Sequence, residues 1–189
     1  FFVDSVRAVR DQVSEPQLKK DISAFIGQEA MHSKEHAAYN DYANEHNIDL
    51  ERLELRIKVL LEWTTRFSTK KQRLAATCAL EHFTATMAEQ LLKREDLTTQ
   101  MNDPKLYQLW MWHAIEENEH KAVAFDVYNQ VCGSRKLLRR AMIMGTFFFV
   151  LDTTRGLAHM LKVDGLLWNW RVWRDGIRWM WGKEGVFRP

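Results

Sequence analysis

The sequence predicts an all-α protein. Apolar residues recur every three or four positions along most of the chain, which is the spacing of one helix face. No window alternates apolar and polar residues long enough to predict a strand. Only 3 prolines and 8 glycines interrupt the 189 residues, although both types are needed wherever a chain turns often. A chain of this length can bury one substantial core, so we expect a helical bundle.

Capping signals predict where the helices begin and end. Ser and Asp side chains accept hydrogen bonds from the first N–H groups of a helix, Pro fits the first turn, and Gly ends many helices. Such signals occur at Ser14, Asp49, Ser68, Asp103 and Ser134. The predicted helices span about 16–46, 69–93, 104–132 and 135–163, with further helices after Asp49 and after Gly165. Residues 1–9 also show a helical pattern and carry no initiator Met, so we expect an N-terminal segment upstream.

In three of the predicted helices, the apolar face continues into carboxylate and histidine side chains. The residues concerned are Glu29, His32 and His36 in the first helix, Glu81 in the second, and His113, Glu116 and His120 in the third. A polar residue on this face points to the core, where an unpaired carboxylate is strongly destabilising. Three helices with the same irregularity indicate one shared buried site.

Metal ions would resolve the electrostatic conflict in such a site. Glu-x-x-His motifs, combined with single glutamates from other helices, are typical of bundles that hold two iron or manganese ions. Glu29-x-x-His32 matches this motif, and Glu116-x-x-x-His120 is a variant of it. We predict two metal ions, with iron first and manganese or zinc as alternatives. A buried salt-bridge network is the other interpretation. Without metal, at least one carboxyl group should have a strongly raised pKa.

The predicted ligands are Glu29, His32, His36, Glu81, Glu116, Glu119 and His120. Glu29 and Glu116 are the candidates for bridging, catalytic carboxylates, because each has a histidine downstream on the same helix face. Three residues are expected to surround the ligands as outer partners: His82, Thr84 and His113. Of these, His113 is also a candidate ligand. A further single carboxylate is still needed, and Glu54 and Glu62 are internal candidates for it.

The three motifs also resemble those of a known family. They are Gln-Glu-x-x-His-x-x-x-His from Gln28, Glu-His-Phe-Thr-Ala from Glu81, and a long segment from Trp112 to Asp126, and they resemble a bacterial family of predicted metal-dependent hydrolases. The similarity extends from Phe1 to about Gly165. It implies a ferritin-like bundle with a di-metal centre, and a Gly-Glu-x-Phe-Phe segment whose Glu would lie just upstream of Phe1.

Three functions are compatible with this site. Our main prediction is an oxidoreductase in which two iron ions use O2 to oxidise a hydrophobic organic substrate, because the ligands lie on apolar stripes that predict a dry site. The alternative is a hydrolase that uses a metal-activated water. A metal-binding or storage protein without catalytic activity is the third.

The last quarter of the chain carries a second signal. Five of the 8 tryptophans lie between Trp168 and Trp181, interleaved with Arg171, Arg174 and Arg178. This pattern is typical of amphipathic helices on membrane surfaces and of protein interfaces. We expect a metal-binding bundle over 1–163 and an amphipathic arm over 164–189. The segment 168–181 would contact a membrane surface, a second copy or the bundle itself. A lipid-like substrate would suit such an arm.

Composition narrows the remaining classes. The net charge is only +2, so nothing favours nucleic acid as a partner. There is no signal-peptide pattern and no run of 18 apolar residues. The two cysteines, Cys78 and Cys132, match no disulfide or zinc spacing and suggest a reducing compartment. We therefore expect a cytoplasmic protein, peripheral at the inner face of the membrane if the arm binds lipid.

Overall fold

The computed structural model describes residues 1–45, 50–99, 101–183 and 185–186. Its regular elements are all helical and the described residues contain no strand, which confirms the all-α prediction. The helices are α1 (Phe2–Arg7), the 3₁₀ turn η1 (Arg10–Gln12), α2 (Pro16–Glu45), α3 (Glu51–Phe67), α4 (Lys70–Lys93), α5 (Glu95–Thr98), α6 (Pro104–His120), α7 (Val123–Val131), α8 (Arg135–Val163) and α9 (Trp170–Trp181).

The chain divides into two compact units, residues 1–147 and residues 148–189. The first unit contains α1 to α7, the start of α8 and all of the candidate site. The second contains the rest of α8 and α9, and so includes the whole of the predicted arm over 164–189.

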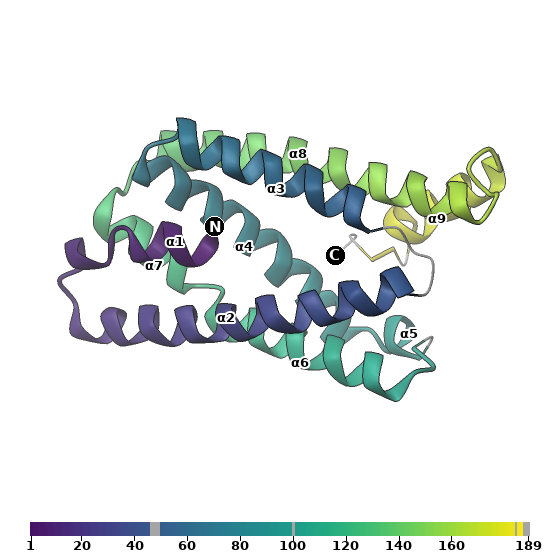
Figure 1. Cartoon of the computed structure of the whole chain (residues 1–189), viewed down its shortest axis with the longest axis horizontal. Coiled ribbons are helices and arrows are strands. Elements are labelled where there is room, and N and C mark those ends of the chain that lie inside the picture. Colours follow the sequence, from purple (N-terminus) through teal and green to yellow (C-terminus); the bar gives the residue numbers. More distant parts are fainter. Residues whose placement is uncertain (46–49, 100, 184, 187–189) are drawn as a thin grey trace. The chain divides into compact units, whose positions relative to one another are not determined.

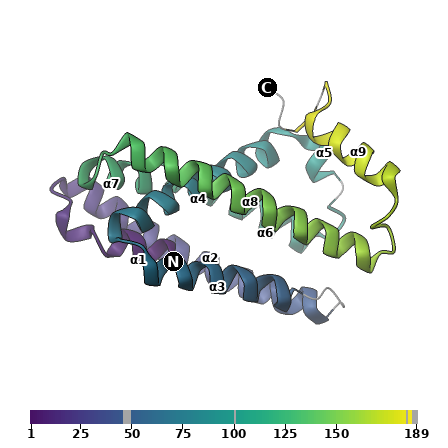
Figure 2. The ribbon, with the colours of Figure 1, turned by 90° about the horizontal axis from the view of Figure 1, so that it is seen from above.

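The core of the first unit lies where α1, α2, α4 and α7 meet. Phe25 and Ile22 from α2, Leu74 from α4, and Val127 and Tyr128 from α7 are almost completely buried there. α6 packs against both α2 and α4 (Figures 1 and 2). Because α6 has a neighbour on two sides, two adjacent stripes of its surface are buried, and this arrangement shapes the site.

Several capping predictions are confirmed. α2 begins at Pro16 and α6 at Pro104. The Asp103 carboxylate accepts hydrogen bonds from the N–H groups of Lys105 and Leu106. Gly133 ends α7 with a left-handed φ of 59°, which a residue with a Cβ adopts at a cost. The predicted cap at Asp49 lies outside the described residues.

Two predictions about helix ends were wrong. Thr69, rather than Ser68, caps α4, because Thr69 and Gln72 exchange side-chain and backbone hydrogen bonds in a capping box. The single helix predicted over 104–132 is two helices, α6 and α7, separated at Lys121 and Ala122. This break directly follows His120, the last of the predicted ligands.

Candidate metal centre

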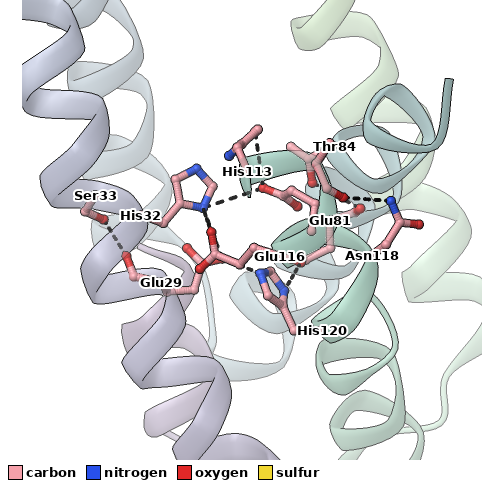
Figure 3. A network of polar contacts seen from close by, with 11 residues as sticks. Glu29, His32, Ser33, Glu81, Thr84, His113, Glu116, Asn118 and His120 are labelled. Carbon is pink, nitrogen blue, oxygen red and sulfur yellow. Dashed lines mark hydrogen bonds and ion pairs between the residues drawn. The ribbon is translucent and has the colours of Figure 1, made fainter. Parts of the chain in front are cut away.

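Three helices bring the candidate ligands together inside the first unit (Figure 3). From α2 come Glu29, His32 and His36, which continue the face that buries Ile22 and Phe25. From α4 comes Glu81, one turn beyond Thr77 and Cys78, which are both buried. From α6 come His113, Glu116, Glu117 and His120. The apolar stripes thus lead directly into the cluster.

One half of the cluster is a buried trio of Glu29, Glu81 and His120. Nδ1 of His120 lies 3.2 Å from Oε2 of Glu81, and Nε2 lies 3.5 Å from Oε1 of Glu29. One ligand atom from each residue can be chosen so that all lie within 4.8 Å of one another. Donors that share a tetrahedral ion at about 2.1 Å lie roughly 3.4 Å apart, so small rotations would let these three side chains bind one ion.

The other half is a group of three imidazoles, His32, His36 and His113. Their ring centroids lie 4.4 Å apart for His32 and His113, 4.6 Å for His32 and His36, and 5.0 Å for His36 and His113. All three rings are half-buried. Their ligand nitrogens also converge within 4.8 Å.

Two adjacent glutamates of α6 lie beside the imidazole group. Nδ1 of His32 lies 3.7 Å from Oε2 of Glu116 and 3.6 Å from Oε1 of Glu117. Oε1 of Glu117 also lies 3.8 Å from Nε2 of His113. Both carboxylates are buried, at 3% and 1% exposure. Glu117 was missed from the sequence because it lies beside the stripe of Glu116. Its position one turn after His113 is the signal that could have revealed it.

The donor set fits metal ions. Most polar atoms of the cluster are buried without a hydrogen-bond partner, including both oxygens of Glu81, both oxygens of Glu116 and both ring nitrogens of His120. Native proteins rarely leave such atoms unpaired. The closest pair is Nδ1 of His120 and Oε2 of Glu81 at 3.2 Å, and the other pairs of the cluster are 3.5–3.9 Å apart, too far for good hydrogen bonds. A self-contained salt-bridge network would satisfy these atoms, whereas this cluster leaves their lone pairs free for a cation.

Burial shifts the pKa values in the directions expected for such a site. It raises the pKa of Glu29 to about 8, with help from Glu81, and the pKa of Glu116 to about 7. It lowers the pKa of His32 to about 3 and that of His113 to about 4, with help from neighbouring imidazoles. The predicted raised carboxyl pKa is thereby confirmed. His32 and His113 are therefore neutral near pH 7, as metal ligands must be.

His120 differs from the other histidines of the cluster. Burial alone would lower its pKa, but the neighbouring carboxylates of Glu81 and Glu29 outweigh burial and raise it. Its ring also packs edge-on against Phe25, with the centroids 5.1 Å apart.

The remaining predicted residues lie in different places. Glu119 is exposed outside the cluster, where it accepts a 2.9 Å hydrogen bond from the Gln28 side chain. His82 is exposed and lines a separate cavity of about 290 Å³ with Cys78 and Phe125. The Thr84 hydroxyl donates to the Glu81 backbone carbonyl at 3.2 Å. It also lies beside Glu117, where its hydrogen bonding partly offsets the effect of burial on the Glu117 pKa.

The internal candidates for a further carboxylate, Glu54 and Glu62, are both exposed on α3 and lie outside the cluster. Glu54 accepts a hydrogen bond from the Asn40 side chain, and Glu62 lines a different groove. Glu117 supplies the extra buried carboxylate.

The family comparison agrees with this chemistry. A family model described as predicted metal-dependent hydrolase matches residues 1–189. The chain belongs to this family. Searches of curated proteins and of solved structures gave no significant match. A metal-dependent family and a buried cluster of candidate ligands together support bound metal ions as cofactors.

Bound metal should stabilise the folded state of this member of the family. An ion that binds only the folded state at about 100 times its Kd contributes roughly 2.7 kcal/mol, or about 5–10 °C in Tm for a chain of this size. We expect Mn²⁺ or Zn²⁺ to raise the Tm of chelator-treated protein by this amount in differential scanning fluorimetry. A Tm that responds to neither chelator nor metal would indicate a purely structural cluster.

Proposed function

We propose that the protein is a hydrolase that uses two metal ions held by the α2–α4–α6 cluster. The observation that carries this proposal is the set of buried, unpartnered carboxylate and imidazole atoms in two adjoining groups. Glu29, Glu81 and His120 would hold one ion, and His32, His36 and His113 the other. Glu116 and Glu117 lie within 3.8 Å of the imidazole group, and Glu81 and His120 of the trio act electrostatically on both, so both are candidates to bridge the ions.

Metal ions bound there would supply Lewis acidity and lower the pKa of a nearby water. The chain itself supplies a carboxylate, that of Glu116, which lies between the buried cluster and the protein surface. Glu116 has buried oxygens in the cluster and also lines a surface groove of about 800 Å³. Its carboxylate oxygens can take up or release a proton where the groove meets the cluster. We assign Glu116 the role of general acid or base.

The groove suggests a hydrophobic substrate. Met31, Trp112 and Ile115 expose apolar side chains in it. Leu109 and Lys105 also line it. Its volume is that of a small-molecule site. An apolar chain in this groove would place its polar end at Glu116, so an ester or amide of a fatty acyl chain fits best.

Turnover without O2 tests the hydrolase directly. Chelated protein would be loaded with Mn²⁺ or Zn²⁺ under anaerobic conditions and given carboxylic and phosphate esters with chains of two to twelve carbons. We expect metal-dependent hydrolysis that increases with chain length. Replacing Ile115 with Trp should fill part of the groove and shift the preference to shorter chains by several-fold. Equal rates with and without metal would contradict the proposal.

Oxidation of the same kind of substrate with O2 is the second candidate. The observation that favours it is the carboxylate-rich half of the cluster, where Glu29, Glu81, Glu116 and Glu117 gather in a water-poor core; this ligand mixture suits iron. Anaerobic loading with Fe²⁺ followed by O2 separates the two candidates. A transient visible absorbance and consumption of O2 with substrate would favour the oxidoreductase, whereas anaerobic turnover favours the hydrolase.

We further propose that α9 binds an anionic lipid surface and brings lipid-derived substrate to the protein. Among the described residues, no helix is both long enough and apolar enough to cross a membrane. α9 is instead strongly amphipathic. Trp170, Ile177 and Trp181 are each more than half exposed, and Arg171, Arg174 and Arg178 lie on the adjacent side of the helix, where the Arg174 guanidinium stacks on the Trp170 ring. Asp175 pairs with Arg174, which leaves a net positive face.

Charge reversal in α9 tests this contact. Each basic residue near an anionic membrane contributes about 1 kcal/mol. The double variant Arg171→Glu/Arg178→Glu should therefore lose more than about tenfold in co-sedimentation with vesicles that contain anionic lipid. The matched control is Arg139→Glu/Arg140→Glu, which reverses two exposed arginines of α8. Unchanged vesicle binding would contradict the lipid proposal, and loss of a dimer in the α9 variant would support a second copy as the partner.

A further inference from the structure

We propose that the two metal positions are chemically unlike: the imidazole group of His32, His36 and His113 prefers Zn²⁺, and the carboxylate trio of Glu29, Glu81 and His120 prefers Mn²⁺ or Fe²⁺. This inference rests on the metal centre of the proposed function but not on hydrolysis. It predicts a mixed-metal centre rather than two equivalent ions.

The imidazole position has the donors of an open zinc site. Its three residues contribute nitrogen ligands only, and three histidines with one open position are typical of catalytic zinc. His32 and His36 come from successive turns of α2, and His113 faces them from α6, so the three rings enclose one point from two helices. Nδ1 of His32 and Nδ1 of His113 are buried without a hydrogen-bond partner.

The carboxylate position has harder donors and deeper burial. Glu29, Glu81 and His120 are all more than 90% buried, and two of the three ligands are carboxyl groups, which bind a metal ion as carboxylates. Carboxylate oxygens suit manganese and iron, whereas imidazole suits zinc and copper. Glu81 and Glu29 together neutralise a divalent ion, which lowers the cost of placing it in the core. The imidazole position has no carboxylate among its own three ligands and draws on carboxylates at its edge, since oxygens of Glu29, Glu116 and Glu117 lie 3.6–3.9 Å from Nδ1 of His32.

Both positions are separable by single substitutions. His36 belongs to the imidazole group and has no close carboxylate partner among the described ion pairs. Glu81 belongs to the carboxylate trio, on α4, which contributes nothing to the imidazole group. His36→Ala should therefore empty one position, and Glu81→Gln the other.

The test is metal content rather than activity. Chelated full-length chain receives one equivalent of Zn²⁺ and a tenfold excess of Mn²⁺, is desalted, and is analysed by inductively coupled plasma mass spectrometry and Mn²⁺ electron paramagnetic resonance. We expect about one zinc and one manganese per chain. Under the same loading conditions, the zinc bound per chain should fall at least tenfold in His36→Ala, while its manganese content stays unchanged. In Glu81→Gln, manganese should fall at least tenfold and zinc should stay.

Two controls keep the result interpretable. Glu62→Gln, an exposed glutamate of α3 outside the cluster, should keep both metals. His113→Gln serves as a second variant of the imidazole position, and circular dichroism verifies the fold of each protein. Loss of both metals together in every folded cluster variant, or random occupancy by both ions, would overturn the inference. Mixed-metal protein that hydrolyses no ester would leave the inference standing and refute the proposed function.

Discussion

Replacing Glu116 with Gln is expected to reduce turnover by more than about 100-fold and to remove one of the two metal ions. Losing an outer partner of a metal ligand already costs about 10–100-fold, and Glu116 lies within the cluster itself. Its carboxylate is buried without hydrogen-bond partners, lies 3.7 Å from Nδ1 of His32 and lines the groove. The amide keeps the size of the side chain but loses the charge and the titratable proton.

The matched comparison for this variant is Glu62→Gln, which makes the same change on an exposed residue of α3. Steady-state kinetics and metal analysis should be carried out on the same preparations. A Glu116→Gln protein that retains two metals and more than a tenth of the parent activity would show that Glu116 has neither role.

The second large effect concerns pH. Without metal, the stability of the folded chain should fall by on the order of 2 kcal/mol between pH 6.5 and pH 8. The raised pKa of Glu29, about 8, and of Glu116, about 7, mean that the folded state holds protons which the unfolded chain has already released. Stability from these groups is complete below about pH 4.5 and is lost as the pH rises through 7–8. The raised pKa of His120 acts in the same direction.

Three other histidines, His32, His36 and His113, have lowered pKa values and oppose this trend, mainly at lower pH. His32 and His113, with pKa values lowered to about 3 and 4, are neutral in the folded chain while the unfolded chain binds protons below about pH 6.5. Their destabilising effect therefore appears as the pH falls below 6.5. Between pH 6.5 and 8 the carboxylates and His120 dominate.

Chemical denaturation in chelator at pH 6.5 and pH 8 measures this difference. Glu29→Gln should flatten the dependence, and saturating Mn²⁺ should reverse it because metal binding displaces the protons. Stability that rises over this interval in the metal-free protein would be inconsistent with buried, protonated carboxyl groups.

Helical periodicity predicted much of the site. Glu29, Glu81 and His120 occupy positions where an apolar side chain would otherwise face the core, and the structure brings them together because each helix buries the stripe on which they lie. His32 and His36 follow on the same stripe of α2. This argument needs no knowledge of how the helices are arranged, since burial of a stripe is a local property of each helix.

Features that depend on which helices pack against one another could not be predicted from the sequence. Glu117 is buried because α6 is covered on two sides, by α2 and α4, and a single stripe cannot indicate a second covered face. Glu119, three residues after Glu116, falls on the uncovered side and bonds with Gln28 instead. The break after His120 has no Pro or Gly to signal it. The cap at Thr69 competed with the adjacent Ser68, a residue type that is preferred over Thr at helix N-termini.

A crystal structure of protein loaded with Mn²⁺ and Zn²⁺, with anomalous data collected at both absorption edges, tests the central claim most directly. We expect two anomalous peaks, one among Glu29, Glu81 and His120 and one among His32, His36 and His113, each about 2.0–2.3 Å from its ligand atoms. A map without peaks in the cluster, in which the carboxylates and imidazoles hydrogen bond to one another, would contradict the metal centre.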